Sequence, residues 1–206
     1  MKDKMIFGLT GMSGAGKSTV CRQFQDAGFH IIDCDKVARQ VVGKGEPCLN
    51  ELHRLFGDGV ITKDGELDRK AMGNIVFNDR DKLRLLNDTI YPYITYKVIS
   101  QLQEIDDKPS VLDAPTLFES GIDYICDAVV SVVCDTEISL KRIMARDGIS
   151  REAAESRLSS QHDAEFYASR SLFCIENNGE VAELEQKTDG IVAQLLEMSK
   201  GNYEKK

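Results

Sequence analysis

The sequence predicts an α/β protein built on a parallel sheet, and two observations carry this prediction. An apolar run at residues 5–10 leads into the glycine-rich turn G-M-S-G-A-G-K-S at residues 11–18, and a helical pattern follows. A second apolar run, at residues 29–32, comes after that helix. Strand, helix and strand in this order form a βαβ unit, which implies parallel strands and a right-handed crossover.

The turn after the first predicted strand fits the phosphate-loop pattern G-x-x-x-x-G-K-[ST] through Gly11, Gly16, Lys17 and Ser18. Together with Gly14, its glycines allow the unusual backbone angles that aim loop N–H groups at a phosphate. Lys17 adds a mobile ammonium for the outer phosphates, and Ser18 offers a hydroxyl to Mg²⁺ at the positive end of the helix. The pattern indicates a nucleoside triphosphate as ligand, because the preceding strand disfavours a glycine-rich turn that binds nothing.

Two carboxylates follow the second strand of the predicted βαβ unit. A helix is expected at Ser18–Ala27 and a strand at Phe29–Ile32, which runs into Asp33 and Asp35 at the edge where parallel sheets bind ligands. If strand geometry continues, both carboxylates share a face, and one can accept a hydroxyl proton beside the phosphate site. The alternative is that Asp35 caps the next helix, at residues 36–42, which would not exclude catalysis.

Residues 36–106 contain helical patterns broken by turns, and no convincing strand. Pro92 is expected to interrupt the long helical stretch from Asp79 to Ile105. We therefore expect a single domain over residues 1–206, in which 1–35 and 107–206 form the nucleotide-binding core and 36–106 form a helical insertion for the second substrate.

The sheet is expected to resume at Ser110–Ala114 and at Ala128–Val133, with a last strand at Leu172–Ile175 before a closing helix at Val181–Met198. Asp113 ends the first of these runs. A carboxylate at a strand end beside a phosphate loop is typical of a ligand to Mg²⁺ and its waters. A turn-forming aspartate is the alternative, and the sequence favours neither.

Arginines cluster on both sides of a helix break at Asp147-Gly148. Beside a phosphate loop, arginines on a hinged element can close over a triphosphate, neutralise charge in the transition state and exclude water. The segment 140–160 is therefore expected to be a lid, with a solvated charged hairpin as the alternative. The arginines concerned are Arg142, Arg146, Arg151 and Arg157.

Composition argues against several other classes of protein. The 206 residues are 42% hydrophobic, enough for a core, and their net charge of −8 argues against a broad nucleic-acid-binding face. No run approaches the ~20 apolar residues of a membrane span, and the first strand begins too early for a signal peptide, so a cytoplasmic protein is expected. The six cysteines form no C-x-x-C pair, which favours buried thiols over zinc ligands or disulfides. The sequence fits a monomer or a weak homo-oligomer.

Taken together, these motifs resemble the dephospho-coenzyme A (dephospho-CoA) kinase family over nearly the whole chain. Many kinases share the phosphate loop, whereas the Asp-x-Asp pair followed by A-R-Q-V-V and the P-x-L-F-E stretch are much more particular. The matching stretches are the loop, residues 31–42, Leu67-Asp68-Arg69, the Pro92 region, residues 112–121, residues 140–152 and I-E-N-N-G at 175–179.

This resemblance implies a P-loop kinase fold with a helical substrate-binding insertion and an arginine-bearing lid. It implies that ATP, with Mg²⁺, phosphorylates the 3′-hydroxyl of the ribose of dephospho-CoA to give CoA and ADP. Catalysis would fall to Asp35 as general base, with Asp33 nearby, and to Lys17 and Arg142. ATP would be bound by Gly11, Ser13, Gly14, Ala15, Gly16, Lys17, Ser18, Thr19, Arg146 and Asn177, the acceptor by Asp35, Arg39, Arg69, Pro115, Leu117 and Glu119, and Mg²⁺ by Ser18 and Asp113.

Three positions depart from the family pattern. Met12 stands where a second glycine is usual, and its side chain is expected to point away from the phosphates. Tyr91 replaces a frequent histidine before Pro92, which puts an acceptor-site role of position 91 in doubt. Phe166 stands where a basic residue often follows Glu165, so part of the nucleotide contact is expected to differ.

Two other functions remain as alternatives. A GTP-binding switch shares the loop but needs an [N/T]-K-x-D element and a D-x-x-G switch. The nearest matches, Gln186-Lys187-Thr188-Asp189 and Asp113-Ala114-Pro115-Thr116, fit neither. A small-molecule kinase that acts on a nucleoside, nucleotide or sugar is the closer alternative.

Overall fold

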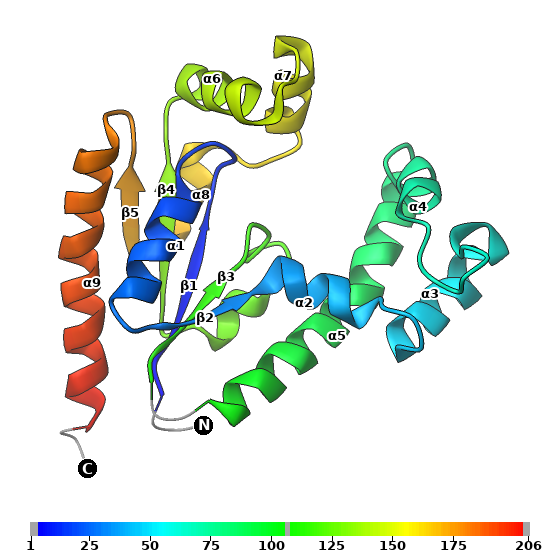
Figure 1. The fold of residues 1–206 in the computed structure, drawn as a ribbon, viewed down its shortest axis with the longest axis horizontal. Helices are drawn as coiled ribbons and strands as arrows, with labels where there is room; N and C mark the ends of the chain where they lie inside the picture. Colours follow the sequence, from blue (N-terminus) through cyan, green and yellow to red (C-terminus); the bar gives the residue numbers. More distant parts are fainter. Residues whose placement is uncertain (1–3, 106–107, 204–206) are drawn as a thin grey trace. The chain divides into compact units, whose positions relative to one another are not determined.

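The computed structural model describes residues 4–105 and 108–203, and its centre is a five-stranded sheet of order β2-β3-β1-β4-β5 (Figure 1). β1 pairs in parallel with β3 and β4, and β4 pairs in parallel with β5. The predicted α/β fold with a parallel sheet is therefore confirmed, with each strand within two residues of its expected position. The strands are β1 (Ile6–Gly11), β2 (His30–Asp33), β3 (Ser110–Asp113), β4 (Ala128–Val133) and β5 (Phe173–Glu176).

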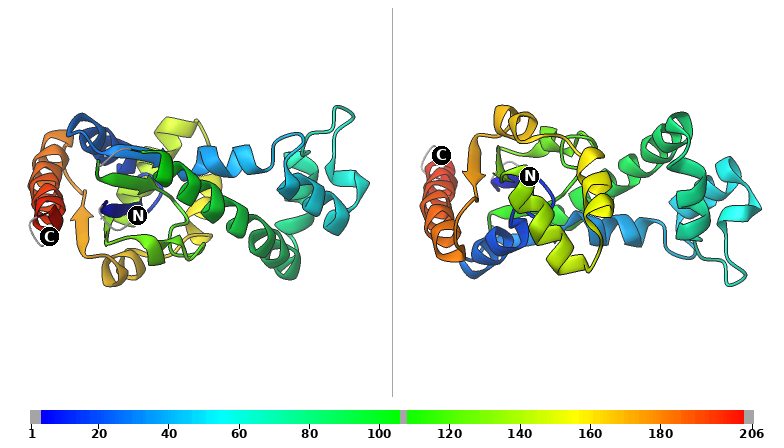
Figure 2. Two further views of the ribbon diagram at one scale, coloured as in Figure 1. Left: turned by 90° about the horizontal axis from the view of Figure 1, so that it is seen from below. Right: turned by 90° about the horizontal axis from the view of Figure 1, so that it is seen from above.

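Helices cover both faces of this sheet (Figure 2). α1 (Lys17–Asp26) and α8 (Ala164–Arg170) lie on opposite faces, and α9 (Val181–Tyr203) packs against α1 and β5. β1 and β4 are buried along their whole length, because helices cover them on both faces. The main core cluster joins the strands to Val20 and Phe24 of α1 and to Tyr167 of α8.

A helical hairpin follows β4. α6 (Thr136–Asp147) ends at Gly148, whose φ of 64° provides the left-handed turn that stops the helix, and α7 (Arg151–Ser159) begins after it. Leu140 and Ile143 of α6 bury one face against Ala154 of α7. The break expected at residues 147–148 thus separates two packed helices. A short 3-10 helix, η2 (Ile122–Ile125), precedes β4.

The backbone forms two compact units. The sheet unit contains the described residues up to Ile32 and from Ile105 onward, and the insertion unit is Asp33–Glu104. In the insertion unit, α5 packs against three other helices. Its elements are α2 (Cys34–Val41), α3 (Pro47–Phe56), the 3-10 helix η1 (Asp58–Val60), α4 (Arg69–Val76) and α5 (Arg80–Glu104).

Pro92 does not interrupt α5, so this prediction from the sequence is wrong. The helix runs without a break from Arg80 to Glu104, with Pro92 inside it. An interior proline removes one helical hydrogen bond and costs about 3 kcal/mol. The buried contacts that α5 makes through Thr89, Val98 and Leu102 offset that cost, because tertiary packing stabilises a helix more than local propensity does.

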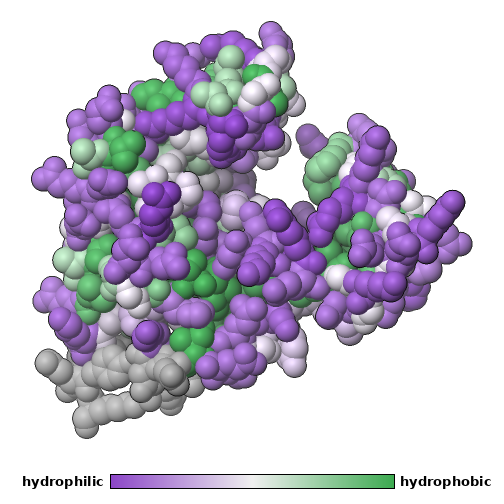
Figure 3. All heavy atoms as spheres, in the orientation of Figure 1, coloured by the Kyte–Doolittle hydropathy of each residue, from purple (hydrophilic) through white to green (hydrophobic). Residues whose placement is uncertain are grey.

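The surface and the thiols agree with the composition. The face in Figure 3 is mostly hydrophilic, with small separate hydrophobic patches. Within residues 4–105 and 108–203, no helix is long and apolar enough to cross a membrane. The six cysteines, all in the described residues, form no disulfide; Cys34, Cys48 and Cys134 are buried and Cys174 is exposed.

Candidate phosphate-binding site and acceptor elements

The phosphate loop lies at the carboxyl end of β1, in the middle of the sheet, and leads into α1. Gly11 has a φ of 141°, and a side chain there would overlap the backbone of Val132 in β4. Gly16 caps α1 with a φ of 101°, and a Cβ atom there would lie 2.6 Å from the amide nitrogen of Asn177. Both positions need glycine for conformation and for space, which explains their place in the motif.

Three consecutive carbonyl groups of the loop accept hydrogen bonds from side chains outside it. The buried Ser139 hydroxyl donates to the carbonyl of Ser13. Arg142 Nη1 donates to the carbonyl of Gly14 at 3.5 Å, and Asn177 Nδ2 donates to the carbonyl of Ala15 at 2.7 Å. These donors hold the loop carbonyls away from the loop interior, so the intervening N–H groups face inward. We call Ser139, Arg142 and Asn177 the carbonyl clamp.

Most of the inward N–H groups have no partner in the protein. Ala15 N–H donates to the Met12 carbonyl at 3.2 Å, and Ser13 N–H donates to Gln161 Oε1 at 3.0 Å. Unpartnered N–H groups in a curled loop before a helix N-terminus form a binding site for an anion such as phosphate. Among the loop residues 11–18, all of them described, the N–H groups for which no protein acceptor is found are those of Gly14, Gly16, Lys17 and Ser18.

Lys17 forms an ion pair with Asp113 at the end of β3. Their side chains are 18% and 19% exposed, so the pair lies at the rim of the loop and both groups remain accessible. Ser18 follows Lys17 in the first turn of α1, and the Asp113 carboxylate and the Ser18 hydroxyl are hard oxygen donors of the type that Mg²⁺ prefers. The side chains of Ser18 and Asp113 are therefore of the chemical type that a magnesium site requires.

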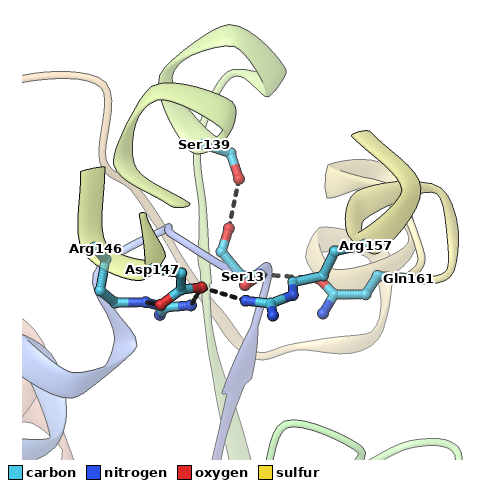
Figure 4. Close-up of polar contacts among 6 residues, drawn as sticks. All are labelled: Ser13, Ser139, Arg146, Asp147, Arg157 and Gln161. Carbon is cyan, nitrogen blue, oxygen red and sulfur yellow. Dashed lines mark hydrogen bonds and ion pairs between the residues drawn. The ribbon is translucent and has the colours of Figure 1, made fainter. Parts of the chain in front are cut away.

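Three of the four arginines predicted for the lid bind carboxylates, and one binds backbone carbonyls. Arg151 pairs with Glu137 and Glu155. Arg146 and Arg157 both bind the carboxylate of Asp147, and Arg146 does so through Nε at 2.7 Å and Nη2 at 2.9 Å (Figure 4). The hydrogen bonds from Arg146 lower the pKa of Asp147 to about 2. Arg142 instead points to backbone carbonyls, including that of Asn177 at 3.0 Å. Among these four arginines, all in the described residues, Arg142 is the one that hydrogen-bonds to the phosphate loop.

Motif analysis did not identify Ser139 and Gln161, which bind the two sides of the Ser13 residue (Figure 4). Ser139 is separated from Ser13 by 126 positions and Gln161 by 148. Neither belongs to a pattern that distinguishes it from other polar residues of a helix or turn. Only the fold, which brings α6 and the α7–α8 connection onto the loop, identifies them.

The P-T-L-F-E stretch has mixed roles in the structure. The Leu117 side chain is fully buried and lies against Gly8, so it packs in the interior; its contact with the acceptor stays a prediction. The Pro115 carbonyl accepts a hydrogen bond from the Thr10 hydroxyl at 3.3 Å. Glu119 lies 3.7 Å from Nε2 of His162. Pro115 and Glu119 thus border segments that adjoin the loop.

Two departures from the family pattern have clear local environments. Met12 is 7% exposed and packs in the main core, and it also lines a pocket of about 580 Å³ with residues of α6, α7 and α8. Its side chain therefore packs in the core while one part of it borders this pocket. Phe166 stacks on His162 with ring centroids 3.5 Å apart, and Arg170 places its guanidinium 4.0 Å from the centroid of the Phe166 ring.

The aspartate pair lies in the insertion unit, and its geometry differs from the prediction. α2 begins at Cys34, so residues 33 and 35 do not continue a strand and do not share a strand face. Asp33 is the N-cap: its Oδ1 accepts from the Lys36 N–H at 2.9 Å. The capping role considered for Asp35 therefore belongs to Asp33. Asp35 lies in the first turn of α2 and is exposed.

The other predicted acceptor residues also lie in the insertion unit. Arg39 lies in the last turn of α2, and Arg69 is the first residue of α4. Both side chains line the same small pocket. The structure thus brings together two arginines that are thirty positions apart in the sequence.

The carbonyl clamp predicts a distinct effect of replacing Asn177. Asn177→Ala removes the donor to the Ala15 carbonyl at a position only 6% exposed, so we expect the KM for ATP to rise about tenfold and stability to fall by about 1–2 kcal/mol. Initial rates and thermal unfolding measure the two effects. Asn178→Ala is the matched control, because Asn178 bonds to Asp135 and Glu176 and not to the loop. Equal changes in the KM for ATP in both variants would contradict the clamp.

Comparison with known proteins identifies the family. The sequence model of the dephospho-CoA kinase family matches residues 5–183. A dephospho-CoA kinase of Fusobacterium nucleatum is 39% identical over 189 residues, which cover 90% of this chain and 95% of the relative. The crystal structure of TT1252 from Thermus thermophilus superposes with a TM-score of 0.80 at 31% identity, over 93% of this chain and 98% of that one. A structure of the dephospho-CoA kinase from Campylobacter jejuni has a TM-score of 0.69 at 33% identity and covers 96% and 98%.

The family match spans most of the chain and includes both the phosphate loop and the aspartate pair. Relatives that carry the same name cover nearly all of it. This chain therefore belongs to the dephospho-CoA kinase family, whose members use ATP to phosphorylate dephospho-CoA in the last step of coenzyme A biosynthesis.

Proposed function

We propose that this protein transfers the γ-phosphoryl group of ATP to the 3′-hydroxyl of the ribose of dephospho-CoA, with Asp35 as general base. The 3′-oxygen forms a bond to the γ-phosphorus, and the bond from that phosphorus to the β,γ-bridging oxygen breaks. The proton of the hydroxyl passes to the Asp35 carboxylate, and ADP leaves with the former bridging oxygen. The products are CoA and ADP.

The phosphate loop carries this proposal. Its four unpartnered N–H groups, the positive end of α1 and the Lys17 ammonium together suit the phosphates of a nucleotide. Phosphoryl transfer depends mainly on positioning and on neutralising negative charge, so these groups supply what the reaction needs. In the nucleotide complex the Lys17 ammonium exchanges the Asp113 carboxylate for the outer phosphates.

Ser18 and Asp113 would hold Mg²⁺, as their oxygen donors fit that ion. When bound, the ion would neutralise charge on the phosphate oxygens. Release of Asp113 from Lys17 makes the carboxylate available to the ion at the same time as it frees the ammonium.

The hairpin of α6 and α7 supplies the remaining arginines. Arg142 holds the loop carbonyl of Gly14, and Arg146 and Arg157 are retained by Asp147 until a nucleotide offers stronger acceptors. Phosphate oxygens are such acceptors, because Arg–phosphate pairs form bidentate, charge-assisted hydrogen bonds. We assign the ATP contact of the lid to Arg146. Asn177, whose side chain supports the loop, would also adjoin the nucleotide.

A cytoplasmic location is part of the proposal. The six cysteines, which all lie in the described residues, form no disulfide, as is usual for proteins of a reducing compartment. The net charge of −8 argues against a basic surface for nucleic acid. The proposed partners, ATP and dephospho-CoA, are small anions that local cationic groups can bind.

A panel of acceptors tests the proposal. With ATP, we expect dephospho-CoA to be phosphorylated at the 3′-position with a kcat/KM at least about 100-fold above that for adenosine, shikimate or gluconate. The true acceptor makes more stabilising contacts with the enzyme in the transition state than these smaller molecules do. Phosphorus NMR of the product identifies the position. A preference for a sugar or a free nucleoside would overturn the acceptor assignment, and GTP hydrolysis without transfer would indicate a switch.

A further inference from the structure

A small cationic pocket lies within the insertion unit, beside the carboxyl end of α2. It has a volume of about 210 Å³. Side chains from three parts of the unit line it: the end of α2 and the turn after it, the connection before α4, and the first residue of α4. The lining residues are Arg39, Val42, Gly43, Lys44, Glu66, Leu67 and Arg69.

The charges in this pocket are unbalanced. Arg39, Lys44 and Arg69 are exposed cations, and Glu66 is the single carboxylate among the lining residues. Across the described part of the chain, no salt bridge involves any of the three cations. Three cations held near each other without carboxylate partners repel one another, and a bound anion relieves that repulsion.

The local structure explains why these cations stay together. Lys44 stands between two glycines in a turn closed by a hydrogen bond from Glu46 N–H to the Gly43 carbonyl at 3.1 Å. Asp68, next to Arg69, caps α4: its Oδ1 accepts from the Ala71 N–H at 2.9 Å, and the carboxylate forms no salt bridge with the described cations. The nearest carboxylate in the sequence therefore has another structural role.

The helical register links the pocket to the proposed base. Asp35 and Arg39 are four residues apart in α2, so they lie on one face of the helix about 6 Å apart along its axis. In an adenosine 5′-diphosphate group, the 3′-hydroxyl and the 5′-phosphate are joined to one ribose ring. The distance between these two groups is comparable to the spacing of Asp35 and Arg39 along the helix. An acceptor whose hydroxyl reaches Asp35 therefore places its 5′-phosphates toward Arg39.

We propose that this pocket binds the diphosphate of dephospho-CoA, and that Lys44 is its third cationic group. This inference rests on the proposed function. The diphosphate, which joins the ribose 5′-carbon to the pantetheine arm, is the only charged group of dephospho-CoA at neutral pH. Arg39 and Arg69 offer planar guanidinium groups for bidentate bonds to its oxygens, and Lys44 adds a point charge.

Kinetics with two acceptors test this site. Dephospho-CoA and adenosine share the ribose 3′-hydroxyl, but only the former carries the diphosphate. In Lys44→Ala we expect the KM for dephospho-CoA to rise about tenfold, with the KM for ATP unchanged, and the selectivity for dephospho-CoA over adenosine to fall by the same factor. Arg69→Ala should show a larger loss of the same kind. Lys63→Ala, an exposed lysine of the same unit outside the pocket, is the matched control.

A variant that is expected to bind dephospho-CoA more tightly provides a second, independent test of the pocket. Glu66→Gln removes the only negative charge of the pocket, so we expect the KM for dephospho-CoA to fall about two- to threefold, and the effect should shrink as salt rises. Inorganic pyrophosphate should compete with dephospho-CoA in the parent and less well in Lys44→Ala.

The outcomes separate the pocket from the proposed function. If the parent does not phosphorylate dephospho-CoA, the proposed function fails. If the parent does so and Lys44→Ala behaves like Lys63→Ala, the pocket assignment is overturned while the function stands. Equal losses with dephospho-CoA and adenosine would also overturn it, because they would indicate a role in folding or chemistry and not in binding the diphosphate.

Discussion

Lys17→Ala is expected to abolish nearly all phosphoryl transfer while the protein still folds. The ammonium contacts charge that develops on the transferred group, and loss of such a contact costs several kcal/mol, or on the order of 10²–10³-fold in turnover. The initial rate of ADP formation with dephospho-CoA measures this loss. The substitution also leaves Asp113 without its partner, which we expect to cost about 1–3 kcal/mol of stability.

Two comparisons make the Lys17 result interpretable. Assays run well below the melting temperature of the variant separate lost chemistry from lost stability. Lys141→Ala, an exposed lysine of α6, should retain parental activity. A folded Lys17→Ala protein with near-parental turnover would show that the loop is not the catalytic phosphate site.

Asp35→Asn is expected to lower turnover by about two orders of magnitude or more with little change in stability. A ribose hydroxyl is a weak nucleophile, and asparagine preserves size but cannot take its proton. The helix cap remains intact in this variant because Asp33 provides it. The negative charge of Asp35 in the first turn of α2 is worth about 0.3–1 kcal/mol.

Asp33 is the matched comparison for Asp35. Asp33→Asn keeps an oxygen for the Lys36 N–H, so we expect near-parental melting and turnover, whereas Asp33→Ala should lose about 1 kcal/mol of stability. Rates and melting curves of all three variants distinguish the base from the cap. If Asp33→Asn is inactive and Asp35→Asn retains parental turnover, the base is Asp33 and our assignment is wrong.

Local patterns were sufficient to predict much of the fold. The loop follows a fully buried apolar strand and precedes a helix, and both neighbours confirm what the spacing of Gly11, Gly16 and Lys17 indicates. The strand at 128–133 has the predicted bounds, because an unbroken apolar run between turn residues matches a strand buried on both faces. Such elements depend on neighbours in the sequence, so the sequence alone identifies them.

Features that depend on distant contacts were not predictable in this way. Pro92 predicts a break in the helix, but α5 continues through it because its packing offsets the cost of the proline. Capping was the alternative considered for Asp35, but the helix begins directly after Asp33, which is the cap; patterns do not resolve a shift of two positions. Arg142 is predicted to belong to a lid, and this stays a prediction; its acceptors, the carbonyls of Gly14 and Asn177, are brought to it only by the folded chain. Lys44 belongs to no motif at all.

The carbonyl clamp determines how late in synthesis the growing chain can bind nucleotide. The loop itself emerges early, at residues 11–18, yet Ser139 is 126 positions and Asn177 is 162 positions from the loop carbonyls that they hold. A nascent chain that stops before β5 contains the whole nucleotide motif but lacks its last support, because domains fold when their distant contacts become available. Nucleotide binding is therefore among the last properties that this chain acquires, although its motif is among the first parts to be made.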